Sequence, residues 1–194
     1  MSEWDEYAAD WDTSAAVRQY ADQAFESLTR LAEAVDFTLP GARACDFGCG
    51  TGLLTERLAD RCTRIDAVDT SSAMREVLEE KIDRQRWTHA RVLDRLPPTR
   101  QGYDLMVCSS VLSFVDDYPE MVGTLVSHLA AGGLFVQWDW ESSGDNDGHG
   151  FTRSEIQQTL EGAGLDPVAV DTGFEVTVDG EVMRPLMGWG RRAF

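Results

Sequence analysis

Three glycines spaced two residues apart follow a short apolar run in the first third of the chain. The segment from Cys45 to Leu54 reads CDFGCGTGLL, with the glycines at Gly48, Gly50 and Gly52. Glycine lets a backbone approach a ligand without an intervening Cβ, and it adopts unusual φ and ψ angles at little steric cost. Open α/β sheets bind ligands at turns of this kind, where a strand leads into a helix. The run therefore predicts a ligand site built from main chain.

Two acidic residues indicate the kind of ligand. Asp69 ends the second predicted strand, 17 residues after Gly52, where a carboxylate can accept hydrogen bonds from both hydroxyls of a ribose. Asp46 lies just before the glycines, where an acid would repel a phosphate but attract an amino group or a sulfonium. Leu53 stands where a dinucleotide-binding G-x-G-x-x-G would need its third glycine. The combination favours a nucleoside cofactor that carries positive charge and no pyrophosphate.

The motifs of this segment and of four later ones resemble those of the class I S-adenosylmethionine-dependent methyltransferases. CDFGCGTG is similar to motif I of that family, and DTSSAM at residues 69–74 is similar to the second motif. VLDRLP at residues 92–97 resembles the next motif, YDLMVCS at 103–109 the fourth strand, and GGLFV at 132–136 the turn and fifth strand. The resemblance covers about residues 42–138. No Asn-Pro-Pro-Tyr or Asp-Pro-Pro-Tyr stretch follows the fourth strand, which disfavours methylation of DNA bases or glutamine.

The resemblance implies S-adenosylmethionine as the cofactor and assigns contacts to it. By resemblance, Asp46 and the glycines line the methionine part, and Asp69 holds the ribose. Thr70 and Met74 would flank the adenine, and the acid of the third motif, Asp94, would meet the adenine amino group. The end of the fourth strand would lie against the cofactor. The expected cofactor-binding residues are Asp46, Gly48, Cys49, Gly50, Gly52, Asp69, Thr70, Met74, Asp94, Arg95, Leu96, Cys108, Ser109, Trp11 and Tyr20.

Trp11 and Tyr20 belong to this set because the N-terminal segment of the resembling family commonly covers the cofactor and substrate pocket. Aromatic residues crowd this part of the chain, and Arg18 lies between the two. The alternative is that these side chains only anchor the segment to the domain.

Two side chains after the fifth predicted strand are candidates for catalysis. Methyl transfer from a sulfonium needs alignment of nucleophile, methyl and sulfur, and a base only where the acceptor must lose a proton. His149 lies in a loop, where its pKa would suit proton abstraction, although a solvated loop histidine is the alternative. Asp139 and Glu141 lie just past the fifth predicted strand, where they alternate with Trp138 and Trp140. Either a carboxylate of this pair lies near the acceptor, or both point outward at a strand end; Asp139 is the catalytic candidate.

The elements that would position these residues alternate along the chain. An amphipathic helix follows Thr13 and extends to about Val35. Strands are expected at residues 42–47, 63–68, 88–93, 103–109 and 133–138, with helices at 52–59, 72–83 and 119–129. A Thr152–Glu155 capping box opens a further helix. Two last strands, 168–178 and 182–189, are expected to form a hairpin through Asp179-Gly180.

This alternation predicts an α/β fold with a doubly wound, Rossmann-like, mostly parallel seven-stranded sheet. An antiparallel C-terminal hairpin strand would lie at one edge, and the first helix would form an N-terminal cap. We expect a single domain over residues 1–194, with residues 1–40 as the helical cap and 41–194 as the Rossmann-like core.

The composition of the chain limits the kinds of partner that we expect it to bind. The 194 residues include 34 acidic and 17 basic side chains, a formal charge of −17, which disfavours nucleic acids and anionic membranes. Lys81 is the only lysine. The four cysteines form no metal-binding pattern and are interpreted as packing residues in a reducing cytoplasm. The N-terminus does not look like a signal peptide, and no apolar run is long enough to span a membrane. We expect a cytoplasmic monomer or homodimer without a metal.

The sequence therefore predicts an S-adenosylmethionine-dependent methyltransferase that acts on an oxygen, nitrogen or carbon nucleophile of a small molecule. Two alternatives stay open. A nicotinamide-dependent oxidoreductase uses the same kind of sheet, although Leu53 speaks against it. A non-catalytic S-adenosylmethionine-binding protein would carry the same cofactor motifs.

Overall fold

The computed structural model describes residues 3–98, 101–142, 150–178 and 181–193. The chain divides into two compact units, Met1–Pro98 and Thr99–Phe194. Each unit alternates strands with helices, so the expected α/β class is confirmed. The expectation of a single domain over residues 1–194 stays a prediction.

The first unit contributes three parallel strands of the sheet, in the order β3-β2-β1. Its elements, in chain order, are η1 (Glu3–Glu6), η2 (Trp11–Thr13), α1 (Ala15–Ala34), β1 (Arg43–Phe47), α2 (Leu53–Ala59), β2 (Arg64–Val68), α3 (Ser72–Gln85) and β3 (Ala90–Leu93). Every predicted element of this part is present, with boundaries that differ by only a few residues. The centres of β1 and β2 are buried, which fits their mostly apolar residues, although each strand also buries one aspartate, Asp46 in β1 and Asp66 in β2.

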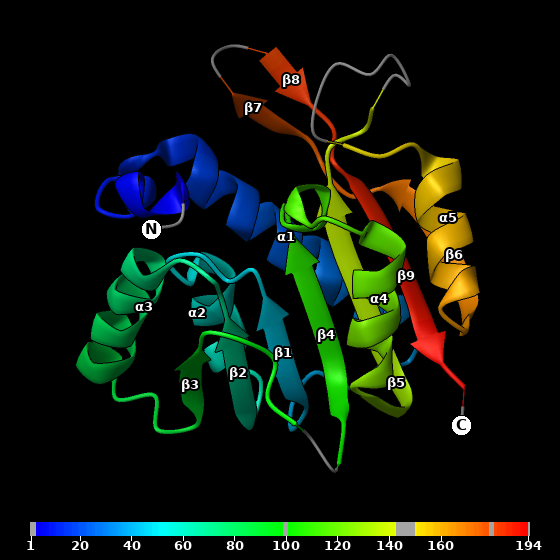
Figure 1. The fold of residues 1–194 in the computed structure, drawn as a ribbon, viewed down its shortest axis with the longest axis horizontal. Coiled ribbons are helices and arrows are strands. Elements are labelled where there is room, and N and C mark those ends of the chain that lie inside the picture. The colour runs from blue at the N-terminus through cyan, green and yellow to red at the C-terminus, as the bar shows by residue number, and fades with distance from the viewer. Residues whose placement is uncertain (1–2, 99–100, 143–149, 179–180, 194) are drawn as a thin grey trace. The chain divides into compact units, whose positions relative to one another are not determined.

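Local sequence determines where the helices of this unit begin. Ser14 caps α1 by accepting a hydrogen bond from the backbone N–H of Val17, and Ser71 caps α3 by accepting one from Met74. One face of α1 is buried, through Ala21, Ala24, Leu28 and Leu31 among others. The blue N-terminal segment lies beside the start of α3 (Figure 1), where Asp5 accepts a hydrogen bond from the Ser71 hydroxyl.

The second unit contributes four strands of the sheet, in the order β4-β5-β9-β6. Its elements are β4 (Tyr103–Ser109), η3 (Leu112–Phe114), α4 (Tyr118–Ser127), β5 (Leu129–Asp139), α5 (Arg153–Gly162), β6 (Leu165–Thr172), β7 (Val176–Val178), β8 (Glu181–Met183) and β9 (Leu186–Arg192). β4 and β5 are parallel, whereas β9 is antiparallel to both β5 and β6. The three strands of the first unit and these four belong to one seven-stranded sheet, as the sequence predicts.

The C-terminal strands differ from the expectation in two respects. Residues 168–178 and 182–189 do not form two long strands, because the chain leaves the sheet after β6 and re-enters it with β9. Between these points β7 and β8 form a separate two-stranded hairpin, which stands apart from the other strands of the unit in Figure 1. Pro185 lacks the N–H that a continuous ladder would need there. The antiparallel strand β9 therefore lies between β5 and β6, and not at the expected edge.

Glycine explains how β9 fits this inner position. A Cβ on Gly188 would lie 2.4 Å from Cγ2 of Ile156, a buried residue of α5. A bare backbone at this point therefore allows α5 to pack directly on the strand. The surrounding core of the unit is formed by large, fully buried side chains, among them Leu105, Met106, Leu125, Leu134, Phe135 and Trp138.

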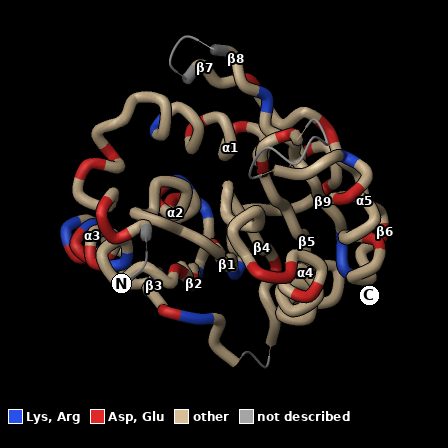
Figure 2. Tube along the Cα trace, turned by 45° about the horizontal axis from the view of Figure 1, so that its top comes forward, with Lys and Arg blue, Asp and Glu red and all other residues tan. Residues whose placement is uncertain are grey.

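Four further observations concern the partners expected from composition. None of the helices in the described residues is both long and apolar enough to cross a membrane. The described part of the chain has no cluster of three or more His, Cys, Asp or Glu side chains suited to a metal ion, and all four cysteines are buried free thiols. Acidic residues occur along both units (Figure 2).

Candidate cofactor site

The glycine loop joins β1 to α2 and depends on positive φ angles. These angles are 73° at Gly48, 53° at Gly50 and 85° at Gly52, in the left-handed region that residues with a Cβ rarely adopt. The backbone N–H groups of Gly48 and Cys49 both donate to the carbonyl oxygen of Val68, at 2.8 and 3.0 Å. The loop is thus fastened to the end of the neighbouring strand β2.

Two of these glycines have different surroundings. A Cβ on Gly50 would meet no described atom within 4 Å, so this side of the backbone opens onto free space. A Cβ on Gly52 would lie 2.2 Å from Cδ1 of Leu78 on α3. Gly50 therefore leaves room for a ligand, whereas the bare backbone of Gly52 is explained by close packing. Sequence spacing alone could not separate these two roles.

Asp69 follows β2, as predicted, and its carboxylate binds the glycine loop. Its Oδ2 accepts a hydrogen bond of 2.8 Å from the Gly50 N–H, and its Oδ1 accepts one of 2.8 Å from the Ser71 N–H. Each carboxylate oxygen has a second lone pair. The side chain is half-buried, so it can hold the loop and still accept hydrogen bonds from two ligand hydroxyls.

Asp46 lies on β1 and is fully buried. Its Oδ2 accepts a hydrogen bond of 2.6 Å from the Thr55 hydroxyl, whereas its Oδ1 has no hydrogen-bond partner among the described residues. Burial raises the pKa of Asp46 to about 7, against the opposing effect of the Thr55 hydrogen bond. An unpartnered buried oxygen is costly. A ligand that brings an ammonium donor would therefore be stabilised here, which fits the cofactor expected from the sequence.

The residues expected around the adenine have diverse surroundings in the first unit. Thr70 is exposed and Leu96 half-buried, and Asp94 and Arg95 form an exposed ion pair of 3.4 Å. Met74 is only 3% exposed, because it lies on the inner face of α3. Their contacts with a cofactor stay predictions.

Cys49, another expected contact, packs its side chain against Ala67 and Leu78. Any cofactor contact it makes would therefore come from its backbone.

The N-terminal segment, residues 3–13, is attached to the glycine loop by a carboxylate that sequence reasoning missed. Asp12 Oδ1 accepts a hydrogen bond of 2.6 Å from the hydroxyl of Thr51, which lies between Gly50 and Gly52. Asp12 Oδ2 lies 2.6 Å from Nζ of Lys81, whose ammonium is also 2.8 Å from Glu56 Oε1. The sequence did contain one indication: Lys81 has helical spacing with Met74 and Leu78, which places it on the face of α3 that the structure buries.

The expected aromatic contacts of this segment pack mainly with one another. Trp11 meets Trp4 edge-on, with ring centroids 6.1 Å apart, and Trp4 lies 6.1 Å from Tyr7. Trp11 and Tyr20 are both half-buried. Packing accounts for Trp11 in this structure, and the cofactor contacts of both residues stay predictions.

In the second unit, Asp139 ends β5 and is 1% exposed. Gln137 links it to Tyr118: the Tyr118 hydroxyl donates to Gln137 Oε1 at 2.8 Å, and Gln137 Nε2 donates to Asp139 Oδ2 at 2.9 Å. Asp139 Oδ1 has no hydrogen-bond partner of normal geometry among the described residues. Burial raises the pKa of Asp139 to about 8, although Gln137 and nearby backbone amides oppose the rise.

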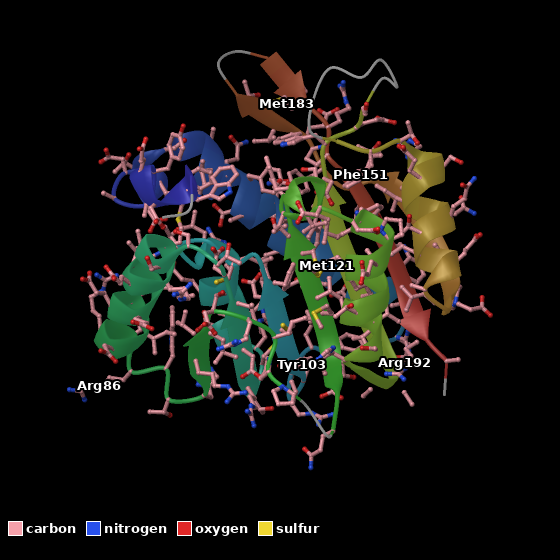
Figure 3. All side chains as sticks on the ribbon, in the orientation of Figure 1. Arg86, Tyr103, Met121, Phe151, Met183 and Arg192 are labelled. Carbon is pink, nitrogen blue, oxygen red and sulfur yellow. The ribbon has the colours of Figure 1, made fainter. Side chains whose placement is uncertain are left out.

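The two carboxylates at the end of β5 point in different directions, and whether Asp139 lies near an acceptor stays a prediction. Glu141 forms an exposed ion pair of 3.1 Å with Arg153 and points outward, whereas Asp139 points into the unit. Phe151, labelled in Figure 3, stacks on the ring of Tyr118 with centroids 4.1 Å apart. Gln137 and Tyr118 carried no sequence signal, because their roles depend on which residues they face.

Three expected site residues remain to be placed. His149 lies outside the described residues. Cys108 is fully buried on β4 and pairs with Gln137 of β5 in the strand register, and Ser109 is half-buried at the end of β4. Their expected roles stay predictions.

The chain is similar to known methyltransferases. Residues 45–135 match the family model of a methyltransferase domain. Over 130 residues the chain is 31% identical to a trans-aconitate 2-methyltransferase of Variovorax paradoxus, an alignment that covers 66% of this chain and 49% of that protein. The chain thus spans about half the length of the curated relatives it matches.

Solved structures resemble the chain over nearly its whole length. A chain of the Haloferax volcanii Trm112 methyltransferase-activator complex matches with a TM-score of 0.79 and 19% identity, covering 100% of this chain and 99% of that one. The N-methyltransferase NodS of Bradyrhizobium japonicum, in complex with S-adenosylhomocysteine, matches with a TM-score of 0.73 and 17% identity, covering 98% and 99%. At these identities the likeness shows the fold, which is the Rossmann-like α/β architecture expected from the sequence.

Proposed function

We propose that this chain, whose residues 45–135 match the model of a methyltransferase domain, belongs to the class I S-adenosylmethionine-dependent methyltransferases and methylates a small molecule. The methyl group would come from S-adenosylmethionine and go to an oxygen, nitrogen or carbon nucleophile. The observation that carries the proposal is the arrangement at Gly50, where an open backbone position is held by the carboxylate of Asp69.

The first unit supplies the cofactor-binding groups in this proposal. The carboxylate oxygens of Asp69 accept hydrogen bonds from the ribose hydroxyls. Oδ1 of Asp46, which has no partner among the described residues, accepts a hydrogen bond from the ammonium of the methionine part. The open side of Gly50 lets the backbone approach the ligand. These three features together favour a cationic nucleoside without a pyrophosphate, and thus S-adenosylmethionine over a nicotinamide dinucleotide.

When bound, S-adenosylmethionine supplies a sulfonium-activated methyl group that an in-line nucleophile can attack. The protein must align the acceptor, exclude water and, for an O–H or N–H acceptor, take up a proton. We assign the last role to Asp139. Its unpartnered Oδ1 can accept the proton, and a pKa of about 8 is close to the range in which a general base is most effective. His149 stays the alternative base.

The acceptor is proposed to be small. The formal charge of −17 disfavours nucleic acids, and relatives named for trans-aconitate and NodS-type N-methylation make carboxylic acids and amines the first acceptors to test. Free thiols at all four cysteines are consistent with the expected cytoplasmic location. Whether the chain is a monomer or a homodimer stays open.

Two measurements test the proposal. Isothermal titration calorimetry should detect binding of S-adenosylhomocysteine and none of NAD; binding of NAD alone would refute the assignment. Transfer of labelled methyl groups should then be measured over a panel of carboxylic acids, amines and phenols. Tight binding of S-adenosylhomocysteine with no transfer to any member of a broad panel would favour a non-catalytic binding protein.

A further inference from the structure

The ammonium group of Lys81 is buried at the junction of three segments of the first unit. Its side chain is 7% exposed, and Nζ lies 2.6 Å from Asp12 Oδ2 and 2.8 Å from Glu56 Oε1. Lys81 belongs to α3, Asp12 to η2 and Glu56 to α2. One positive charge therefore joins the N-terminal segment to two helices that pack around the glycine loop.

Asp12 carries this link on to the loop itself. While Oδ2 faces the ammonium, Oδ1 accepts the hydroxyl hydrogen of Thr51 at 2.6 Å. Thr51 is 1% exposed and is the neighbour of Gly50, whose N–H donates to Asp69. The side chain of Arg18 also donates to the carbonyl oxygen of Asp12. Lys81, Asp12 and Thr51 thus form a continuous contact from α3 to the loop residue beside the proposed cofactor.

A second attachment of the N-terminal segment does not involve this charge. Asp5 accepts a hydrogen bond of 2.6 Å from the Ser71 hydroxyl, and the Ser71 N–H donates to Asp69. The segment is therefore attached on both sides of the Asp69 carboxylate. Of these two attachments, the one at Thr51 is the one that involves Lys81.

The contact between the N-terminal segment and Thr51 depends on the positive charge of Lys81. Burial of an ammonium is costly unless close carboxylates compensate it, and here two do so. Without the ammonium, Asp12 and Glu56 would face each other uncompensated, and Asp12, which is 30% exposed, could turn to water. The N-terminal segment would then lose its contact with Thr51.

From these contacts we propose that Lys81 is a positioning residue for the cofactor, acting through Asp12 on the N-terminal segment and on Thr51. It governs how tightly the cofactor is retained and leaves the methyl-transfer step unchanged. The inference rests on the proposed function for its ligand, but the underlying contact can be tested without any ligand.

The principal test is Lys81→Met. Hydrogen exchange of the peptide covering residues 3–13 should become faster in the ligand-free variant than in the unsubstituted protein. Calorimetry should show binding of S-adenosylhomocysteine weakened about tenfold, a change of about 1.4 kcal/mol. KM for S-adenosylmethionine should rise similarly, with kcat within about twofold, as expected when only binding is lost. Lys81→Arg should restore part of the affinity, because it keeps the charge.

A matched control removes another ion pair of the same unit. Arg91 binds the buried carboxylate of Asp66 through two hydrogen bonds, of 2.6 and 2.9 Å, and joins β3 to β2. Arg91→Met should lower the stability of the protein without changing exchange in residues 3–13 or affinity for S-adenosylhomocysteine. If Lys81→Met behaves like this control, Lys81 only stabilises the fold and the proposal is wrong.

If Lys81→Met does not fold, Asp12→Asn is the variant that tests the proposal. It removes the charge at a partly exposed position, and it should reproduce both the faster exchange and the weaker binding; unchanged exchange would overturn the proposal. If the unsubstituted protein fails to bind S-adenosylhomocysteine, the proposed function is wrong, while the exchange measurement still decides whether Lys81 positions the N-terminal segment.

Discussion

The carboxylate of Asp69 and the backbone N–H of Gly50, 19 residues apart in the chain, are joined by a hydrogen bond of 2.8 Å. The bond holds the glycine loop at the end of β2 with its open side free. In the proposed function, the carboxylate that binds the ribose also determines the shape of the loop. Substitutions at either residue should therefore affect cofactor binding more than a surface contact would.

Asp69→Ala should weaken binding of S-adenosylhomocysteine by about 2 kcal/mol, the scale of lost charge-assisted hydrogen bonds. The substitution removes the proposed ribose contacts together with the bonds to Gly50 and Ser71. Calorimetry measures the change. Asp83→Ala, which removes an exposed acid of α3, serves as the control for charge. Equal affinities of Asp69→Ala and the unsubstituted protein would contradict the ribose assignment.

Gly50→Val should abolish cofactor binding in a folded protein, because the side chain would fill the open space beside the loop. The positive φ angle adds strain of about 1–2 kcal/mol, which chemical denaturation should detect. Gly52→Ala should be more destabilising, since its Cβ would lie 2.2 Å from Leu78. Gly123→Ala in α4, where no described atom is within 4 Å of the new Cβ, should leave binding intact. Retained affinity in Gly50→Val would show that the ligand does not approach this position.

The ligand-free protein should lose stability as the pH rises from about 4 to 8. The pKa of Asp46 rises from 3.8 to about 7, and that of Asp139 rises from 3.8 to about 8. The folded state therefore binds more protons than the unfolded state in this range, and its stability falls with rising pH until each folded-state pKa is passed. Urea denaturation at several pH values measures the slope. Asp46→Asn and Asp139→Asn should each flatten it; an unchanged slope in both variants would mean that neither carboxyl titrates abnormally.

Asp139→Asn should lower kcat by about 100-fold or more for an acceptor that loses a proton, the usual scale of general-base catalysis. KM for S-adenosylmethionine should change little. Glu141→Gln is the matched control, because this carboxylate is two residues away, exposed and paired with Arg153. Steady-state kinetics of both variants decide the role. If Asp139→Asn only lowers stability and keeps kcat, the residue supports the Gln137 and Tyr118 hydrogen bonds, and His149 becomes the candidate base.

The strands, helices and glycine loop of the first unit followed from local patterns. Apolar runs predicted β1 and β2, three-four spacing predicted α1, and the position of Asp69 followed from where β2 ends. The order of the C-terminal strands did not follow, because β9 enters between β5 and β6 through pairings that no local pattern encodes. The Asp12–Thr51 contact was missed for the same reason, since it joins residues 39 apart.

The sequence by itself determined the types of the elements, the turn that needs glycine and the acids at the ends of the strands, because hydrophobic period and backbone preference act over a few neighbouring residues. Only the tertiary structure decided that Gly50 faces open space and Gly52 faces Leu78. It also decided that one oxygen each of Asp46 and Asp139 has no hydrogen-bond partner within the part of the chain that the structure describes. Burial and hydrogen bonding at these positions depend on residues brought together from distant parts of the chain.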